Sequence, residues 1–220
     1  PGLVPPRELD ATVEKIHSNS RNQSREATGA AASNLDLYQV NCTYFDALGG
    51  NISDYLLTRA IQFFLPGVPQ VYYVGLLGGR NDMSLLKRSL VGRDINRHYY
   101  NATEIDGALD TPLVQDLIAL IKFRNAHPSF GGTFSYSLNG TQSLSLRWQR
   151  GAHTAVLDVD FATLQWDIHA SKSDAGNLPE WISRAPTCVA QSASAAFNAT
   201  TSLPCACGDN SGCESKRQER

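Results

Sequence analysis

The sequence predicts an α/β fold in which helices and one buried strand are followed by a small antiparallel β domain. The run PQVYYVG at residues 69–75 is β-branched and aromatic, with no polar alternation beyond Gln70. Such a run is typical of a parallel strand that is covered on both faces. Helical patterns flank it, and short alternating segments bounded by turn residues begin after Gly131.

The expected helices carry end signals of their own. Ser53 is a suitable N-cap, and Pro66-Gly67 would stop the helix that it begins. Thr111-Pro112 would begin another helix, with proline in its first turn. The sequence therefore predicts helices over residues 5–17, 54–65 and 111–127.

The second half predicts a different architecture. Asn139-Gly140 is a hairpin signal between two of the alternating segments. Antiparallel strands are expected over residues 133–138, 143–149 and 154–160, and long loops over residues 18–34 and 75–100. The predicted division is a β/α region at 1–130, a small antiparallel β domain at 131–169, and a Ser/Ala/Cys-containing tail with little fixed structure at 170–220.

Composition excludes several classes of function. The 220 residues carry a formal net charge of −2, which gives no electrostatic basis for binding nucleic acid. Residues 60–79 lack charge, but prolines interrupt them, so no membrane span is expected. The tail cysteines do not follow zinc-ligand spacing, and no metal site is expected. The chain begins at Pro1 and its sole methionine is Met83, which indicates a fragment or a processed product.

The loop after the predicted buried strand is the natural place for a site, because β/α barrels position their sites on such loops. Its segment GRDINRHYY, residues 92–100, is dense in groups that can bind hydroxyls. The alternative is a surface salt-bridge cluster that holds the loop in place. Composition alone leaves both interpretations open.

Four motifs resemble one family. LPGVPQVYYVG (65–75) and LIALIKFRNAHPSF (117–130) resemble the last strand and last helix of the glycoside hydrolase family 13 barrel, in the α-amylase superfamily. AASNLDLYQVN (31–41) and GRDINRHYY (92–100) resemble the sucrose phosphorylase branch, and the resemblance runs from about residue 3 to about 160. It implies the C-terminal portion of such an enzyme: the closing part of a (β/α)8 TIM barrel, then the small β domain.

The resemblance implies a retaining transfer of glucose from sucrose to phosphate, giving glucose 1-phosphate and fructose. The nucleophile and the acid/base would lie upstream of Pro1, so the chain alone is expected to be inactive. Substrate-binding roles fall on Asp36, Leu37, Tyr38 and Gln39 of the acceptor loop, and on Arg93 beside the glucosyl unit. No cofactor is expected, since inorganic phosphate is the co-substrate.

Other interpretations stay open at this point. They are a related glucoside phosphorylase, a sucrose hydrolase, and a non-catalytic sugar-binding or interaction module. The resemblance implies a cytoplasmic enzyme with sucrose and phosphate as partners, and a homodimer is an option for the complete protein. The tail cysteines and six N-x-S/T sequons leave secretion open.

Overall fold

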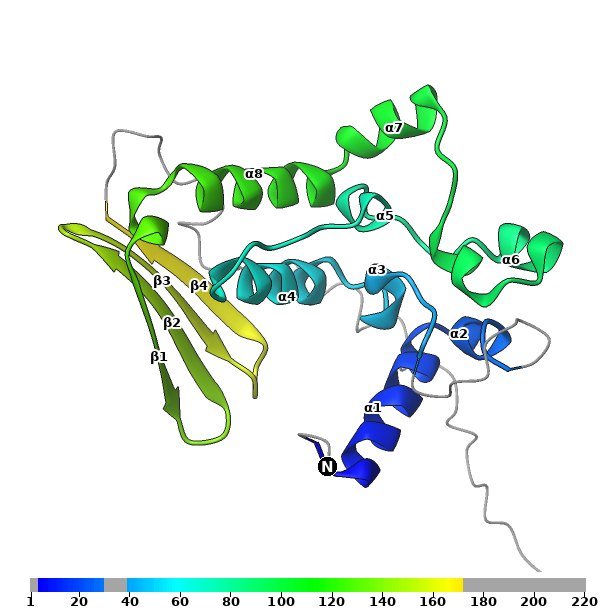
Figure 1. Cartoon of the computed structure of the whole chain (residues 1–220), viewed down its shortest axis with the longest axis horizontal. Helices are drawn as coiled ribbons and strands as arrows, with labels where there is room; N and C mark the ends of the chain where they lie inside the picture. The colour runs from blue at the N-terminus through cyan, green and yellow to red at the C-terminus, as the bar shows by residue number, and fades with distance from the viewer. Residues whose placement is uncertain (1–3, 30–38, 172–220) are drawn as a thin grey trace, which may run out of the picture. The chain divides into compact units, whose positions relative to one another are not determined.

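The computed structural model describes residues 4–29 and 39–171, which belong to one compact unit. In chain order the helices are α1 (Pro6–Asn19), α2 (Gln23–Glu26), α3 (Tyr44–Ala47), α4 (Ile52–Phe64), α5 (Tyr73–Leu76), α6 (Met83–Ser89), the 3-10 helix η2 (Gly92–Asn96), α7 (Ala102–Leu109), α8 (Pro112–Ala126) and the 3-10 helix η3 (Pro128–Gly131). The strands that follow are β1 (Thr133–Asn139), β2 (Ser143–Arg150), β3 (His153–Asp160) and β4 (Gln165–Ala170) (Figure 1).

The second half forms a four-stranded antiparallel sheet in the order β1-β2-β3-β4. The three predicted strands are confirmed as β1, β2 and β3, whereas β4 was not predicted. Leu146 of β2 pairs with Leu157 of β3, which pairs with Ile168 of β4, and all three side chains are buried. Because side chains alternate between the two faces of a strand, this register places one apolar row on a single face.

That apolar face packs against the helices. The buried side chains of α4, α8 and the sheet form one hydrophobic cluster. The Phe64 ring lies 5.2 Å from that of Phe130, and the Trp148 indole donates to the Phe64 carbonyl at 2.7 Å. Arg124 donates to the Phe63 carbonyl at 2.6 Å and lies over the Phe130 and Trp148 rings. Helices and sheet therefore share a core, while the domain boundary at residue 131 stays a prediction.

The strand predicted at residues 69–75 is wrong. Tyr72 is extended, with φ −68° and ψ 145°, but the chain then turns into α5. Within the described residues the strands are β1 to β4, and none of them pairs with this segment. Its Gln70 carbonyl instead accepts from the Gln62 side chain at 2.8 Å. A β-strand needs a ladder to a neighbouring strand, so the extended run lacks the partner that would define it.

All three predicted helices are confirmed, and the one expected over residues 54–65 is α4. The helices expected over 5–17 and 111–127 are α1 and α8, and Thr111 caps α8. The cap of α4 is Asn51 rather than Ser53, because the Asn51 side chain accepts from the Asp54 amide at 3.2 Å. The loop expected at 18–34 contains α2, and that expected at 75–100 contains α6 and η2. The structure also adds α7.

Some predictions concern the rest of the chain. Most of the predicted tail, residues 172–220 with its four cysteines, lies outside the described residues. In residues 4–29 and 39–171, no helix combines the length and apolar character needed to cross a membrane.

Candidate functional site

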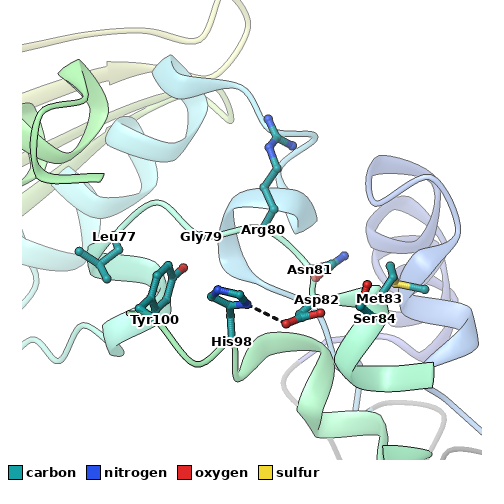
Figure 2. A pocket seen from close by; sticks show the side chains of 9 residues that line it. All are labelled: Leu77, Gly79, Arg80, Asn81, Asp82, Met83, Ser84, His98 and Tyr100. Carbon is teal, nitrogen blue, oxygen red and sulfur yellow. Dashed lines mark hydrogen bonds and ion pairs between the residues drawn. The ribbon is translucent and has the colours of Figure 1, made fainter. Parts of the chain in front are cut away.

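The segment between α5 and α7 lines a pocket of about 490 Å³ (Figure 2). Its lining residues are Leu77, Gly79, Arg80, Asn81, Asp82, Met83, Ser84, His98 and Tyr100. They come from both ends of the loop that the sequence singled out, so α6 and η2 bring the two ends together. A pocket of this volume falls within the range of small-molecule sites.

Asp82 organises one wall of the pocket. Its carboxylate caps α6 by accepting from the Leu85 amide at 2.8 Å. Its own amide donates to the Ile95 carbonyl at 2.7 Å, which joins the start of α6 to η2. Ile95 is fully buried and clusters with Ala27 and Leu86. The two sides of the loop are therefore fixed to one another by backbone bonding and a small apolar core.

Asp46 of α3 holds the entry to this loop. One carboxylate oxygen accepts from Arg80 at 2.8 Å, and the other accepts from the Asn81 amide at 2.7 Å. The Asn81 side chain in turn accepts from the Thr43 amide at 2.7 Å. Asp46 is 7% exposed, so these are hydrogen bonds to a mostly buried carboxylate, which are stronger than neutral ones. The pocket wall is thus anchored to α3.

His98 links Asp82 to Glu104. Its Nδ1 lies 2.7 Å from Asp82 Oδ2, as the dashed line in Figure 2 marks, and its Nε2 lies 3.3 Å from Glu104 Oε1. Both ring nitrogens can donate together only in the imidazolium form. The hydrogen bond to Asp82 raises the pKa of His98; burial opposes this, and Glu104 adds to it. Protonation is therefore favoured where the ring bridges two carboxylates.

The carboxylate of Asp82 stays ionised for the complementary reason. Burial acts to raise its pKa, but the hydrogen bonds from His98 and from the Leu85 amide outweigh burial. The resulting pKa of Asp82 is lowered. A stable charge in this wall gives the pocket a permanent acceptor of hydrogen bonds.

Tyr100 forms the opposite wall. Its ring lies 4.6 Å from that of His98 and 6.2 Å from that of Tyr73, edge to face in both cases. The Tyr73 hydroxyl donates to the His98 carbonyl at 2.9 Å. A Cβ added to Gly79 would lie 2.1 Å from the Tyr100 hydroxyl oxygen, so Gly79 is the residue that lets the phenol approach the backbone.

The substrate-binding residues predicted from the sequence are not among the described residues that line this pocket. Arg93 is exposed on η2, and Gln39 is exposed at the start of the second described range. Neither lines the pocket. Their segments are adjacent, because the Asn96 side chain donates to the Cys42 carbonyl at 3.3 Å. Asp36, Leu37 and Tyr38 lie outside the described residues, so the five roles stay predictions.

Sequence reasoning did not assign Asp82, His98, Ser84 or Tyr100 as site residues. The signal available was the density of charged and aromatic residues in the loop. Nothing in the spacing indicated that Asp82 and His98, sixteen positions apart, would be hydrogen-bonded.

Among the described residues, neither the Cys42 thiol nor a metal-binding cluster adds a reactive centre to the pocket. Burial raises the pKa of the Cys42 thiol to about 11, although hydrogen bonds from Asn81 and Ser20 act in the other direction. The thiolate, which is the nucleophile, is therefore scarce at neutral pH. In the part of the chain that the structure describes, no group of three or more His, Cys, Asp or Glu side chains could hold a metal ion.

Comparison with known proteins identifies the class to which this segment is related. No family model matches the chain. The chain does match curated proteins, and these are phosphorylases named after the glucoside that each one cleaves. One of them is a glucosylglycerol phosphorylase of Marinobacter adhaerens, which is 39% identical over 160 residues. It aligns with 72% of this chain and 33% of the relative.

Within that class, the chain is homologous to part of the sucrose phosphorylases. It is 60% identical over 171 residues to the enzyme of Agrobacterium vitis, and the alignment covers 78% of this chain and 35% of the relative. It is 56% identical over 159 residues to the enzyme of Bifidobacterium adolescentis, and this alignment covers 72% of this chain and 32% of the relative. The chain thus spans about one third of the length of the curated relatives that it matches.

A solved structure agrees with this relationship. The crystal structure of sucrose 6F-phosphate phosphorylase from Thermoanaerobacter thermosaccharolyticum superposes with a TM-score of 0.69 at 33% sequence identity. The match covers 80% of this chain and 36% of that protein. The described fold therefore occurs within a phosphorylase about three times as long as the matched part.

Proposed function

We propose that this chain is part of a retaining glucosyltransferase that converts sucrose and phosphate to glucose 1-phosphate and fructose. The observation that carries the proposal is the 60% identity to a sucrose phosphorylase over 171 residues. Because the chain matches one third of that relative, the activity is assigned to the longer protein and not to the chain alone.

In this proposal, the helical half closes a (β/α)8 barrel, and the antiparallel sheet packs against its last helices. The order α4, extended segment, α5 and α8 is the order of a helix, a strand and a helix at the end of such a barrel. The extended segment at residues 69–72 would then gain its ladder from strands upstream of Pro1. Exposed side chains support this, since Tyr72 within the segment is 52% exposed and Val68 immediately before it is 89% exposed.

The chemistry divides between this chain and the upstream part. Retention requires a carboxylate nucleophile and a carboxylic acid/base about 5–5.5 Å apart, and we assign both to the upstream part. Arg93 would hold the glucosyl hydroxyls, because a planar guanidinium donates several hydrogen bonds in fixed directions. Asp36, Leu37, Tyr38 and Gln39 would form the acceptor loop. Its end adjoins the Arg93 segment through Asn96 and Cys42, an arrangement that supports one shared site.

The test is a chimera in which the upstream two thirds of the Agrobacterium vitis enzyme precede this chain. With sucrose and phosphate it should release glucose 1-phosphate and fructose, whereas the chain alone should release neither. Arg93→Gln should lower kcat/KM of the chimera by at least about tenfold, which corresponds to the loss of a charged hydrogen bond. Arg147→Gln, an exposed arginine of β2, should leave the rate unchanged. A folded chimera without phosphorolysis contradicts the proposal.

A second candidate is a phosphorylase with another acceptor. The 39% identity to a glucosylglycerol phosphorylase and 43% identity over 134 residues to a sucrose 6(F)-phosphate phosphorylase favour it over unrelated activities. Supplying the chimera with sucrose, sucrose 6F-phosphate or glucosylglycerol distinguishes the two candidates. The substrate with the highest kcat/KM identifies the acceptor.

A further inference from the structure

The turn between β1 and β2 contains a side chain that the proposed function does not use. Asn139 ends β1, and residues 140–142 connect it to β2 at the end of the sheet opposite η3 (Figure 1). Asn139 and the three connecting residues are all exposed. The amide of the Asn139 side chain makes no hydrogen bond to any described residue. An exposed and unbonded asparagine that precedes a glycine is open to reaction with its own backbone.

The reaction joins the side chain of Asn139 to the backbone of Gly140. The Gly140 nitrogen, once it has lost its proton to hydroxide, attacks the Asn139 side-chain carbonyl carbon and closes a succinimide ring. The bond from that carbon to the side-chain nitrogen breaks, and the nitrogen leaves with the electron pair and takes up a proton as ammonia. Water then opens the ring at either carbonyl, which gives aspartate or isoaspartate. The sum consumes one water and releases one ammonia, with no oxidant and no enzyme.

The geometry of Gly140 favours this attack. A side chain on the residue after the asparagine would crowd the attacking nitrogen, and Gly140 has none. A Cβ added to it would meet no atom within 4 Å, so the surroundings are open as well. Its φ of +64° lies in the left-handed region, and glycine moves between this region and negative φ at little cost. Its amide also donates to no backbone carbonyl of the described residues. The nucleophile is therefore both tethered to its target and free to approach it.

The other asparagines lack this combination. None of them precedes a glycine in the sequence. Asn41 is 9% exposed, and its side chain donates to the Ala27 carbonyl at 3.3 Å. The side chains of Asn51 and Asn101 accept from backbone amides at the starts of α4 and α7, at 3.2 and 3.0 Å. These contacts hold the side-chain amides away from the backbone nitrogen that would attack them.

Asn125 is the closest comparison. Like Asn139 it is exposed and makes no side-chain hydrogen bond to a described residue. It lies in the last turn of α8, however, and is followed by Ala126. Helical backbone amides are engaged in bonds to carbonyls four residues back, and alanine carries a Cβ. Asn125 therefore shares the side-chain exposure of Asn139 but not its reactive neighbour.

Isoaspartate at position 139 would change the hairpin. Its main chain runs through the former side chain, so the backbone gains one atom between β1 and the turn. Position 139 forms the last pair of the β1–β2 ladder, opposite Ser143. The Gln142 carbonyl in the same turn accepts from the Phe161 amide at 2.7 Å, which joins this turn to the one after β3. Ladder pairing depends on regular backbone spacing, so the extra atom should break these end contacts.

We propose that Asn139 is a site of spontaneous deamidation, and that its isoaspartyl product opens the end of the β1–β2 hairpin. This proposal does not rest on the sucrose phosphorolysis proposed above, because it needs only water and the residues of one turn.

The experiment is an incubation of the 220-residue chain at physiological temperature, at neutral and at mildly alkaline pH. Peptide mapping by mass spectrometry follows each asparagine, and a synthetic peptide of residues 137–143, SLNGTQS, is incubated in parallel. Asn139 should convert to aspartate and isoaspartate within the time in which the peptide converts. The rate should rise with pH, because the deprotonated backbone amide is the nucleophile. The product is also more acidic, since it adds one negative charge to a chain of formal net charge −2.

Two variants test the reacting pair. Asn139→Gln should abolish the acidic form, because glutamine would have to close a larger ring. Gly140→Asp should slow the conversion of Asn139 by at least about tenfold, since its side chain crowds the attacking nitrogen while aspartate tolerates the left-handed region. The matched control is Asn125→Gln, the same chemical change at the exposed helical asparagine, which should accumulate the acidic form at the wild-type rate.

The effect on the hairpin is measured by thermal unfolding. After incubation, the wild-type chain should unfold about 2–4 °C below the equally incubated Asn139→Gln variant, a shift comparable to the loss of one or two hydrogen bonds. Before incubation, the two midpoints provide the reference for this comparison.

Three results would overturn the proposal. The first is an intact Asn139 in the folded chain at a time when the synthetic peptide has been converted. The second is an acidic form that accumulates in Asn139→Gln as fast as in the wild type, which would place the reaction at another residue. The third is an isoaspartyl chain that keeps the unfolding midpoint of the unmodified chain, which would show that the end of the hairpin stays closed.

Discussion

Replacing Phe64 by leucine tests whether the helices and the sheet unfold together. Phe64 is fully buried, and its ring lies 5.2 Å from Phe130 and 6.4 Å from Phe123. Leucine keeps an apolar side chain at this position but removes both aromatic pairs, each of which contributes about 0.5–1.5 kcal/mol. The free energy of unfolding should fall by about 1–3 kcal/mol. In a domain of this size, each kcal/mol of lost stability lowers the thermal unfolding midpoint by about 2–4 °C, so the midpoint should fall by about 2–12 °C.

Two probes report on the two parts of the molecule during thermal unfolding. Far-ultraviolet circular dichroism follows the helices, and tryptophan fluorescence, recorded in a Trp181→Phe background, follows the sheet through Trp148 of β2 and Trp166 of β4. If the shared core couples them, the Phe64→Leu variant shows one transition that is shifted equally in both signals. The control is Phe161→Leu, because Phe161 is 43% exposed beyond β3 and its replacement should change stability by no more than about 0.5 kcal/mol.

The reasoning is refuted if the fluorescence transition keeps its wild-type midpoint while the dichroism transition shifts. The sheet would then fold without the α4 and α8 core, and the boundary predicted at residue 131 would be a real domain boundary. Coincident shifts would instead make residues 39–171 one cooperative unit.

Three further predictions follow from the loop and the exposed surface. Because the pKa of His98 is raised in the folded protein, its bridge to Asp82 and Glu104 contributes stability that is fully present below the ordinary histidine pKa. This stability is lost as the pH rises through the pKa of His98 in the folded protein. Denaturant titrations of His98→Gln should therefore lack the decrease in the free energy of unfolding that the wild-type chain shows above about pH 6.5. Gly79→Ala would place its Cβ 2.1 Å from the Tyr100 hydroxyl and should cost about 1–3 kcal/mol, whereas Gly107→Ala, with nothing within 4 Å in α7, should be neutral or stabilising. The exposed Val68 and Tyr72 should make the isolated chain self-associate, and Val68→Lys should shift its sedimentation toward the monomer; a monomeric wild-type chain would contradict this.

Local signals were sufficient to predict the first three strands of the antiparallel sheet and α8. The Asn139-Gly140 turn and the alternating residues fix β1 and β2 through neighbours that are close in sequence. Thr111-Pro112 fixes the start of α8 in the same way. The strand predicted at residues 69–75 was wrong because a β-strand needs a neighbouring strand, and none of the described strands pairs with this segment. Without such a ladder among the described residues, the end of the run adopts the helical turn α5.

The site was less predictable than the fold. Asp82 and His98 belong to one loop, but their hydrogen bond depends on α6 and η2 folding back on one another. The tight approach of Tyr100 to Gly79 depends on the same folding. Pair geometry of this kind is set by tertiary packing, which neither composition nor spacing encodes. The motif GRDINRHYY contains His98 and Tyr100 of the pocket, but it neither contains Asp82 nor indicates which of its own residues line the pocket.

The contacts also indicate how the chain supports Arg93. Its η2 segment is held from one side by the Asp82 amide on the Ile95 carbonyl at 2.7 Å, and from the other by Asn96 on the Cys42 carbonyl at 3.3 Å. Both anchors lie inside this chain and need no upstream residue. The geometry around Arg93 is therefore set locally, even though the reacting carboxylates are assigned elsewhere. It follows that Asn96→Ala in the chimera should raise KM for sucrose more than it lowers kcat, because it loosens the support of Arg93, whose proposed role is to bind sucrose, and removes no reacting group.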